Sequence, residues 1–458
     1  MSSTTIDRLP LRKPLPEWAT RKARWERMVP VFGIQILNPF FLFLLGLTVV
    51  GLLLVSYREV IGLGPVSGMN DKFGWGIWKT FNVVVLTALG SGAFSVGFAA
   101  WVFGRKLLFS LMRMALLTSM LAYVCGLALL GVDVGRPWNF YWVLFPWSWN
   151  LHSPMAEVAI CMSIYATIPL LIENIPPILE RLWYVNVHLR PAIEKFERGL
   201  HNLFPFIIAL AYLLPAMHQS SLGALMLLAG PRVHPLWQTP LLPLLYLGAA
   251  AFMSFGCVAG TTMLCCLAWR RAMDMEVLDE AARICGWMIF GWIALRVVDL
   301  LFRGVLGTAF SFDRFAGIFW AEMLMVGYGG YLLRLSLKNR KWRTMWLGYL
   351  ISAIGGMLYR FTPTTLAYMP GPKAIYFPST IELLVAIGFV AAGICGFLFM
   401  VKVCAMLPAT LQEWRDMTSY YTVHRPYALW TKYLDFGFVD FKLLDSDLSR
   451  YYGKANHD

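Results

Sequence analysis

The sequence predicts an all-α, polytopic integral membrane protein with about ten transmembrane helices and both termini in the cytoplasm. Of its 458 residues, 58% are hydrophobic and only 14% are charged, a composition that leaves too little polar surface for a water-soluble domain. Apolar runs of roughly 20 residues, the length that crosses a bilayer, recur along the chain. The Lys and Arg residues between these runs fall on alternate sides, which is typical of a multi-pass protein.

The expected spans divide the chain into three parts. A basic cytoplasmic segment occupies residues 1–37, a transmembrane helical domain occupies 38–405, and an aromatic cytoplasmic tail occupies 406–458. The tail is expected to dock at an interface because it is rich in Tyr, Phe and Trp. Within the helical domain the expected spans are residues 38–57, 76–103, 109–132, 154–176, 201–218, 240–268, 284–302, 315–333, 344–360 and 380–404.

The distribution of positive charge fixes the expected orientation. With a cytoplasmic N-terminus, about 29 of the 39 Lys and Arg residues lie inside and about 8 outside, whereas Lys79 and Arg296 fall within spans. The net charge of +13 is therefore explained by topology and by attraction to anionic membrane lipid, and no nucleic-acid partner is expected. No cleavable signal is expected either, because the first apolar run follows about thirty polar residues and is too long for a signal-peptide core.

The cysteines and histidines predict no redox centre within this chain. The eight Cys residues form no C-x-x-C pair, and we expect them to pack as small apolar side chains that hold neither an iron–sulfur cluster nor another metal. A haem needs two histidines that face each other at one depth, and His201 and His218 would stand about 25 Å apart on one helix. An outer pair of His152 with His218 stays open. The glycines within residues 90–97 predict close helix packing rather than a nucleotide-binding loop.

Polar residues gather in the predicted outer loops, which are short and dense in Gly, Pro, Trp and His. Asp133 either forms a helix-end ion pair with Arg136 or accepts protons near a redox ligand. His218 begins a polar block at the expected outer end of a span, and a quinone headgroup requires such donors, a proton exchanger and an apolar channel for its tail. Most of the loop tryptophans are expected to form an aromatic belt at the lipid–water boundary: Trp138, Trp142, Trp147, Trp149 and Trp237.

Charged residues at the expected membrane depth are a second group of candidates, because a charge in hydrocarbon is costly. Arg296 and Asp299 would share one helix face, so they either neutralise each other or belong to a proton path. Glu157, Glu173 and Glu322 have no sequence-local partner, and we expect them to relay protons between the cytoplasm and the outer site. The complete group is Lys79, Glu157, Glu173, Arg296, Asp299, Glu322, Arg360 and Glu382.

Seven sequence motifs between residues 60 and 400 carry a family resemblance. They are Ile61–Ser67, Trp75–Trp78, Asp133–Arg136, Leu214–Gly223, Val233–Gln238, Tyr376–Ser379 and Glu382–Leu384. Together they resemble the long form of the NrfD/polysulfide-reductase membrane-subunit family, and within it the integral membrane subunits of hydrogenase-2-type nickel–iron hydrogenases. The His-Gln-Ser-Ser block is specific to the long form, whereas the Asp-x-Gly-Arg element is shared across the family. The basic N-terminus and the aromatic tail depart from the hydrogenase pattern.

The resemblance implies a haem-free subunit of the bacterial inner (cytoplasmic) membrane, with two helix bundles and a quinone, menaquinone or ubiquinone, near the periplasmic side. It implies a ferredoxin-like iron–sulfur subunit, together with hydrogenase large and small subunits, on the periplasmic face. By position, the family's quinone-site elements fall on Asp133, Arg136, His218, Gln219, Ser220 and Ser221.

We therefore expect the quinone-reactive subunit of a respiratory oxidoreductase, catalytic only within its complex and most specifically part of a nickel–iron hydrogenase. Proton pumping, the direction of electron flow and the oligomeric state stay open. A quinol-oxidising anchor of a sulfur-compound, sulfite or alternative-complex-III-like enzyme is one alternative. A transporter is another, although we find no inverted repeat, and a purely structural anchor without a quinone site is the third.

Overall fold

The computed structural model describes residues 30–31, 34–150, 152–269, 275–371 and 376–407. The predicted N-terminal segment and C-terminal tail, and with them both termini, lie almost wholly outside the described residues. A short antiparallel ladder precedes the first helix, in which β1 (Pro30–Val31) pairs with β2 (Ile34–Gln35).

The prediction of an all-α, polytopic membrane protein is confirmed. Among the described residues, nine helical segments are long and apolar enough to cross a membrane. Some of them are single helices, and the others are assembled from shorter pieces. In chain order they are α2 (Pro39–Ile61), η2–α4–α5 (Trp78–Leu86, Thr87–Leu89, Gly92–Trp101), η3–α6 (Lys106–Leu111, Met112–Asp133), α7–α8–α9 (Pro154–Thr167, Pro169–Glu173, Ile175–Val185), α11 (Phe204–Leu227), α12 (Leu242–Trp269), α13 (Met275–Phe302), α14 (Arg314–Asn339) and α16 (Thr380–Val403).

The tenth expected span, residues 344–360, is a helix of lower hydropathy. It corresponds to α15 (Trp342–Phe361), whose 20 residues span about 30 Å at the usual rise per residue. Arg343 and Arg360 near its two ends make it less apolar than the other nine helices. Since α15 packs along both α12 and α14, its neighbours supply the apolar surroundings that its own sequence lacks.

Short elements connect the long helices. The connections are α3 (Leu63–Val66), η4 (Pro137–Leu144), η5 (Pro146–Ser148), η6 (Val187–Leu189), α10 (Arg190–His201), η7 (Gly230–Arg232), η8 (Leu306–Phe310) and η9 (Thr362–Leu366). We call the end of the molecule that bears α3, η4, η5, η7, η8 and η9 the outer end, and the opposite one the inner end. The positive-inside rule supports this choice, because the basic turns at Arg105–Lys106 and Arg340–Lys341 lie at the inner end.

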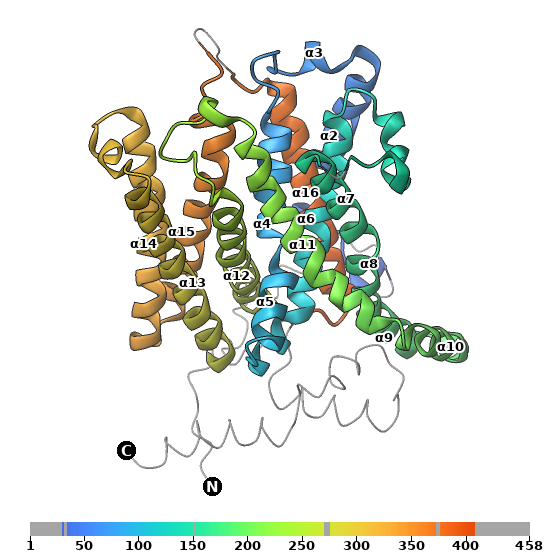
Figure 1. Ribbon diagram of the computed structural model, residues 1–458. Helices are drawn as coiled ribbons and strands as arrows, with labels where there is room; N and C mark the ends of the chain where they lie inside the picture. Colours follow the sequence, from blue (N-terminus) through green and yellow to red (C-terminus); the bar gives the residue numbers. More distant parts are fainter. Residues whose placement is uncertain (1–29, 32–33, 151, 270–274, 372–375, 408–458) are drawn as a thin grey trace, which may run out of the picture.

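The long helices form the two bundles that the resemblance implied (Figure 1). The first bundle contains η2–α5, η3–α6, α7–α9 and α11, and the second contains α12 to α15. Helix α12 packs against both α11 and α5, so it joins the bundles. Helices α2 and α16 pair with each other beside α6, and a Cβ atom added to Gly51 would lie 2.9 Å from the Gly388 Cα atom. Only glycine permits this close approach of two helix backbones.

Two predictions about small residues are confirmed. A Cβ atom added to Gly90 or Gly92 would lie 2.4 Å from Ala122 or Val258, so this glycine-rich stretch serves helix packing. All eight cysteines are free and lie in buried or half-buried positions, as expected for apolar packing residues.

Candidate functional site

The polar block that begins at His218 lies inside a helix rather than at the outer surface. Its span was expected to end at residue 218, but α11 continues to Leu227, and both His218 and Gln219 are fully buried. The expected surface position is therefore wrong. The hydroxyls of Ser220 and Ser221 donate to carbonyls one turn earlier in α11, at 2.9 and 2.7 Å. Because these groups are satisfied within the helix, the polar block does not end it.

A buried arginine connects this block to the second bundle. Arg360 Nη2 donates to Gln219 Oε1 at 2.6 Å, while its Nε and Nη1 donate to the carbonyls of Val84 and Tyr246 at 2.8 and 2.6 Å. The guanidinium also lies 4.4 Å from the centre of the Tyr246 ring. No carboxylate among the described residues forms an ion pair with Arg360, which is fully buried. Carbonyl and amide dipoles therefore hold this cation.

Gln219 extends these hydrogen bonds to two further helices. Its Nε2 donates to Thr87 Oγ1 at 3.2 Å and to the Tyr123 hydroxyl at 3.1 Å. The Tyr123 hydroxyl in turn lies 3.4 Å from Ser91 Oγ. We call Thr87, Tyr123, His218, Gln219 and Arg360 the central network. Its members come from α4, α6, α11 and α15, so only the folded bundle brings them together.

His218 presents a proton acceptor to this network. Its Nδ1 lies 3.2 Å from the Val158 carbonyl, which can only accept, so we assign the ring proton to Nδ1. The Nε2 lone pair then faces Thr87 Oγ1 at 3.3 Å. The Thr87 hydroxyl also contacts the Val83 carbonyl, and it can donate to only one of these two partners at a time. A neutral His218 can therefore accept a proton where Thr87 and Gln219 meet.

The segment that carries Thr87 into place is a π-helix. Residues Trp78–Leu86 form nine residues of π-helix, a conformation that is rare and often found at functional sites. Its Val84 carbonyl is the one that Arg360 binds. The Asn82 amide is buried in the same segment and has no hydrogen-bond partner among the described residues. A buried amide without a partner in the protein can hydrogen-bond to a water molecule or to a group of a ligand.

A cavity lies directly outward of the central network. Its volume is about 200 Å³, and its walls include Trp75, Met155, Met226, Thr364 and Tyr368. Met226 follows Gln219 by two helical turns on the same face of α11, which places it about 10 Å farther out. In the same way, Thr364 lies one turn beyond Arg360. The cavity is thus large enough for one six-membered ring and lies between the buried polar groups and the outer end. Flexible Met side chains form part of its wall.

Asp133 forms a separate polar site at the outer end. It is buried at the last residue of α6, and its Oδ2 lies 2.8 Å from Lys79 Nζ. The alternative in which Asp133 pairs with Arg136 is wrong, because the chain leaves the helix after Asp133 and carries Arg136 to an exposed position before η4. Asp133 Oδ1 has no hydrogen-bond partner among the described residues. A buried carboxylate oxygen therefore stays available at this end of the bundle.

Glu382 has a structural role close to that site. Its Oε2 accepts from the backbone N–H groups of Gly68 and Ser379, both at 2.8 Å, and its Oε1 accepts from the Tyr376 hydroxyl at 3.0 Å. With Ser379 it completes a capping box at the first turn of α16. Its place at the helix start, rather than at membrane depth, explains why this carboxylate is retained.

Arg296 pairs across helices rather than with Asp299. Its Nη1 lies 2.9 Å from Glu322 Oε2, and both residues are buried. Glu322 also accepts from Trp237 Nε1 at 3.0 Å and from the Thr362 hydroxyl. The alternative in which Arg296 and Asp299 neutralise each other is therefore wrong, while their place in a proton path stays a prediction. Trp237 is buried beside this pair and does not belong to an aromatic belt, whereas Trp138, Trp142 and Trp147 are exposed.

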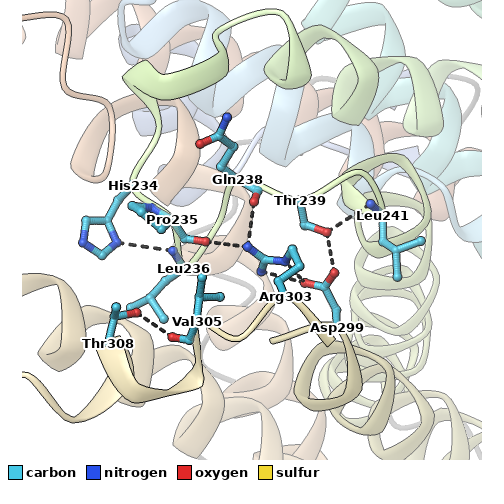
Figure 2. A network of polar contacts seen from close by, with 10 residues as sticks. All are labelled: His234, Pro235, Leu236, Gln238, Thr239, Leu241, Asp299, Arg303, Val305 and Thr308. Atoms are coloured by element: carbon cyan, nitrogen blue, oxygen red, sulfur yellow. Dashed lines mark hydrogen bonds and ion pairs between the residues drawn. The ribbon is translucent and has the colours of Figure 1, made fainter. Parts of the chain in front are cut away.

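Asp299 has its own partners near the outer end of the second bundle, as Figure 2 shows. Arg303, in the turn just after α13, pairs with Asp299 Oδ2 at 2.7 Å, and Thr239 donates to Oδ1 at 2.6 Å. Arg303 Nη1 also donates to the carbonyls of Pro235 and Gln238, both at 2.8 Å. This network ties the loop after α11 to α13.

The predicted proton-path residues do not form one continuous line. Glu157 is half-buried in the first turn of α7, where the helix dipole favours a carboxylate. Glu173 is buried in α8 in the inner half of the first bundle, just after the helix break at Pro169. Arg296, Asp299 and Glu322 lie in the second bundle in the pairs described above. Of the five residues, only Glu173 lies inward of the central network in the same bundle.

Sequence reasoning missed three residues of the central network. Arg360 was noted as a charge at membrane depth, but not as a site residue. Thr87 and Tyr123 gave no local signal, because a Thr and a Tyr within apolar helices look like ordinary packing residues. Their roles become visible only from their contacts with Gln219.

His234, in the outer loop before α12, supports a pH prediction. Its ring stacks on Phe315 with centres 4.3 Å apart, and Nδ1 accepts from the Leu236 N–H at 3.4 Å. Burial is the main cause that lowers the pKa of His234 below its usual 6.5, although the nearby Asp313 acts in the opposite direction. Below about pH 6.5 the unfolded chain then binds more protons at this position than the folded one, so acid favours unfolding.

We therefore expect the melting temperature of the protein to fall as the pH is lowered from about 7.5 to about 5, and to fall less in His234→Gln. Thermal unfolding of both proteins in the same detergent measures the difference. Equal pH dependence in the two proteins would contradict this assignment.

The fold and the central network define a class of protein: a multi-pass helical membrane protein whose polar centre lies between two bundles, below an outer cavity. Residues 65–368 match the family described as polysulphide reductase, NrfD, and the chain belongs to this family. The family predicted from the motifs is thereby confirmed.

Three relatives show the range of assemblies in which similar chains occur. A probable Ni/Fe-hydrogenase 2 b-type cytochrome subunit of Escherichia coli (strain K12) is 34% identical over 389 residues, covering 84% of this chain and 96% of the relative. The integral membrane subunit of a menaquinone reductase from Nitratidesulfovibrio vulgaris is 28% identical over 258 residues, 54% of this chain and 58% of the relative. A selenate reductase subunit from Mesobacillus selenatarsenatis is 23% identical over 180 residues, 39% of each chain.

Proposed function

We propose that this chain is the quinone-reactive membrane subunit of a respiratory oxidoreductase in the bacterial inner membrane, and specifically of a nickel–iron hydrogenase. The observation that carries the proposal is the ring-sized cavity directly outward of the central network. The hydrogenase 2 relative, matched over nearly its whole length, supports the hydrogenase assignment. The menaquinone reductase relative supports the quinone as substrate.

The residues of the network suit the chemistry of a quinone. Reduction to the quinol adds two electrons and two protons to the ring, and negative charge develops on its oxygens before protonation. For a quinone ring that passes inward from the cavity to the network, Gln219 and the Tyr123 hydroxyl are hydrogen-bond donors to such an oxygen, and Arg360 places an uncompensated positive charge behind Gln219. His218 exchanges a proton through Nε2. The electrons come from a partner, which we propose is a ferredoxin-like iron–sulfur subunit at the outer end, with the hydrogenase large and small subunits beyond it.

Haem does not fit the histidine that is buried most deeply. The hydrogenase relative is described as a b-type cytochrome subunit, which raises the question of a haem in this chain. Both ring nitrogens of His218 are engaged, one by the Val158 carbonyl and one by Thr87, in a densely packed helix interior. His152 is exposed in the turn before α7, so it does not share this environment. We therefore assign no step to haem.

Protons are proposed to reach the network from the inner side through Glu173. This buried carboxyl group lies in the same bundle, and the buried Tyr165 ring stands edge-on to Tyr123 with centres 4.7 Å apart. Uptake from the inside would add to the membrane potential. Glu173→Gln is then expected to lower quinone-linked proton uptake from the cytoplasmic side about tenfold, measured with a pH-sensitive dye in vesicles. Unchanged uptake and unchanged turnover would exclude Glu173. Glu157→Gln, at the outer start of α7, is the control outside this route.

Replacing one residue of the central network and one of the outer Asp133 site tests the quinone function itself. His218→Ala and Asp133→Asn are expected to lower hydrogen-dependent quinone reduction by roughly 10²-fold, the usual size of a lost proton-transfer group. Ser220→Ala is the matched control, because among the described residues its hydroxyl donates to carbonyls of its own helix. Hydrogen-dependent reduction of a soluble dye reports the partner subunits and should stay unchanged. Wild-type quinone rates in both variants would favour a purely structural anchor.

The same residues suit quinol oxidation if the partner enzyme accepts electrons from the membrane quinol. The selenate reductase relative makes an electron-accepting partner the second candidate. Co-purification of the native complex separates the two, since hydrogenase subunits and terminal reductase subunits differ in their metal content.

A further inference from the structure

The short helix α10 leaves the two bundles at their inner end. It comprises Arg190–His201 and follows α9 through the turn η6 (Figure 1). In Figure 1 the long helices lie side by side, whereas the short helices α9 and α10 lead away from them toward the lower right. A helix in this position lies at the level where the hydrocarbon of the inner leaflet gives way to headgroups.

One side of α10 is apolar over its whole length. The apolar residues of α10 and of the positions that flank it recur every three or four positions and fall within about 100° of the helix circumference: Leu189 just before α10, Ala192, the buried Ile193, Phe196 and Leu200 within it, and Leu203 just after it. Phe196 is 47% exposed and Leu203 is 52% exposed. A shallow groove of about 500 Å³ runs along this side between Ala192 and Leu200, with Lys195 on its edge.

The helix that follows α10 has a lipid-facing side near its start. Phe206, near the start of α11, is 68% exposed, and Leu210 and Leu213 follow it on the same face, also exposed. Side chains of this kind on a transmembrane helix face acyl chains. This lipid-facing surface begins at Phe206, five residues after the end of α10, so α10 follows the bundle at membrane level.

Basic groups border this apolar side. Lys195 is exposed at the groove, and Arg190 stands at the junction with α9. The Arg190 guanidinium lies 5.4 Å from the Trp183 ring centre, and its Nε donates to the Trp183 carbonyl at 3.1 Å. Since Trp183 is buried, this contact fixes Arg190 at the start of α10. A lysine that extends from an apolar surface can place its ammonium group beside a phosphate.

We propose that α10 is an interfacial helix that binds an anionic phospholipid of the inner leaflet, with an acyl chain in the groove and Lys195 beside the phosphate. This site is independent of the quinone chemistry and lies at the opposite end of the bundle. Such a lipid would hold α9 and α10 against the membrane and so fix the inner ends of α8 and α11.

A photo-crosslinking amino acid tests which molecule occupies the groove. With p-benzoylphenylalanine at position 196 in the complete complex in native membranes, illumination is expected to yield a phospholipid adduct by mass spectrometry. The same amino acid at position 194, on the polar side of the helix, should give at most a small fraction of that yield. A crosslink from position 196 to protein instead, either residues 408–458 of this chain or another subunit, would overturn the proposal.

A second measurement tests the charge. Anionic phospholipid retained by the purified complex is expected to fall by roughly half or more in Lys195→Glu and to stay near the wild-type amount in Lys195→Arg. Glu194→Gln is the control on the opposite side of α10. Equal retention in the Glu and Arg variants would refute a phosphate contact, and the crosslink decides the case if Lys195→Glu prevents assembly.

Discussion

Arg360→Gln is expected to reduce hydrogen-dependent quinone reduction by the assembled complex roughly 10²-fold, while reduction of a soluble dye by its partners is unchanged. The variant removes the cation behind Gln219 and leaves the carbonyls of Val84 and Tyr246 without their donor. Each buried group left unpaired costs about 1–3 kcal/mol, so we also expect a lower melting temperature. Thermal unfolding and quinone turnover should be measured on the same preparation.

Arg360→Lys separates the charge from the geometry. Lysine keeps a positive charge but cannot reach Val84, Tyr246 and Gln219 at once, because its ammonium is a single point on a flexible stem. We expect quinone turnover between that of the wild type and that of Arg360→Gln. The melting temperature should be almost as low as that of Arg360→Gln. If Arg360→Gln folds and turns over quinone at the wild-type rate, the central network is a structural feature, and the quinone site must be sought at Asp133 and Lys79.

Glu322→Leu is expected to destabilise the protein by about 3–5 kcal/mol, because it leaves the buried Arg296 without its carboxylate. The Arg296 guanidinium lies among aromatic rings, 4.5 Å from the centre of the Tyr359 ring and 4.9 Å from that of Phe319. These rings stabilise the cation, but they do not replace a charged partner. Chemical or thermal unfolding in nanodiscs measures the effect, with Glu157→Gln as a half-buried control that should change little.

The double variant shows whether Arg296 and Glu322 act as a unit. Arg296→Met with Glu322→Leu is expected to be more stable than either single variant, because it leaves no unpaired buried charge. Additive losses in the double variant would contradict a coupled pair. If instead every variant stays stable but proton movement is lost, the pair belongs to a proton path, as its position at membrane depth first suggested.

The amino-acid sequence by itself determined the class of fold. A helix that crosses a bilayer needs about 20 apolar residues, and its backbone groups hydrogen-bond within the helix itself. Both requirements concern neighbouring residues in the sequence, so hydropathy identified the spans. It missed where α11 ends, because Ser220 and Ser221 satisfy their hydroxyls within the helix. It also placed α15, as the span 344–360, although Arg343 and Arg360 lower the hydropathy of this helix, because the residues between them are largely apolar.

Only the tertiary structure decided which polar groups meet. Arg360 binds Gln219 across 141 positions of sequence, and Trp237 binds Glu322 across 85. The local alternatives were wrong for different reasons. The chain leaves α6 after Asp133 and so carries Arg136 away, whereas the rotation of α13 and α14 about their axes directs Arg296 toward Glu322. The rotation of a helix is fixed by packing, for example at Gly90 and Gly92, and sequence spacing along one helix carries no information about the helix that faces it.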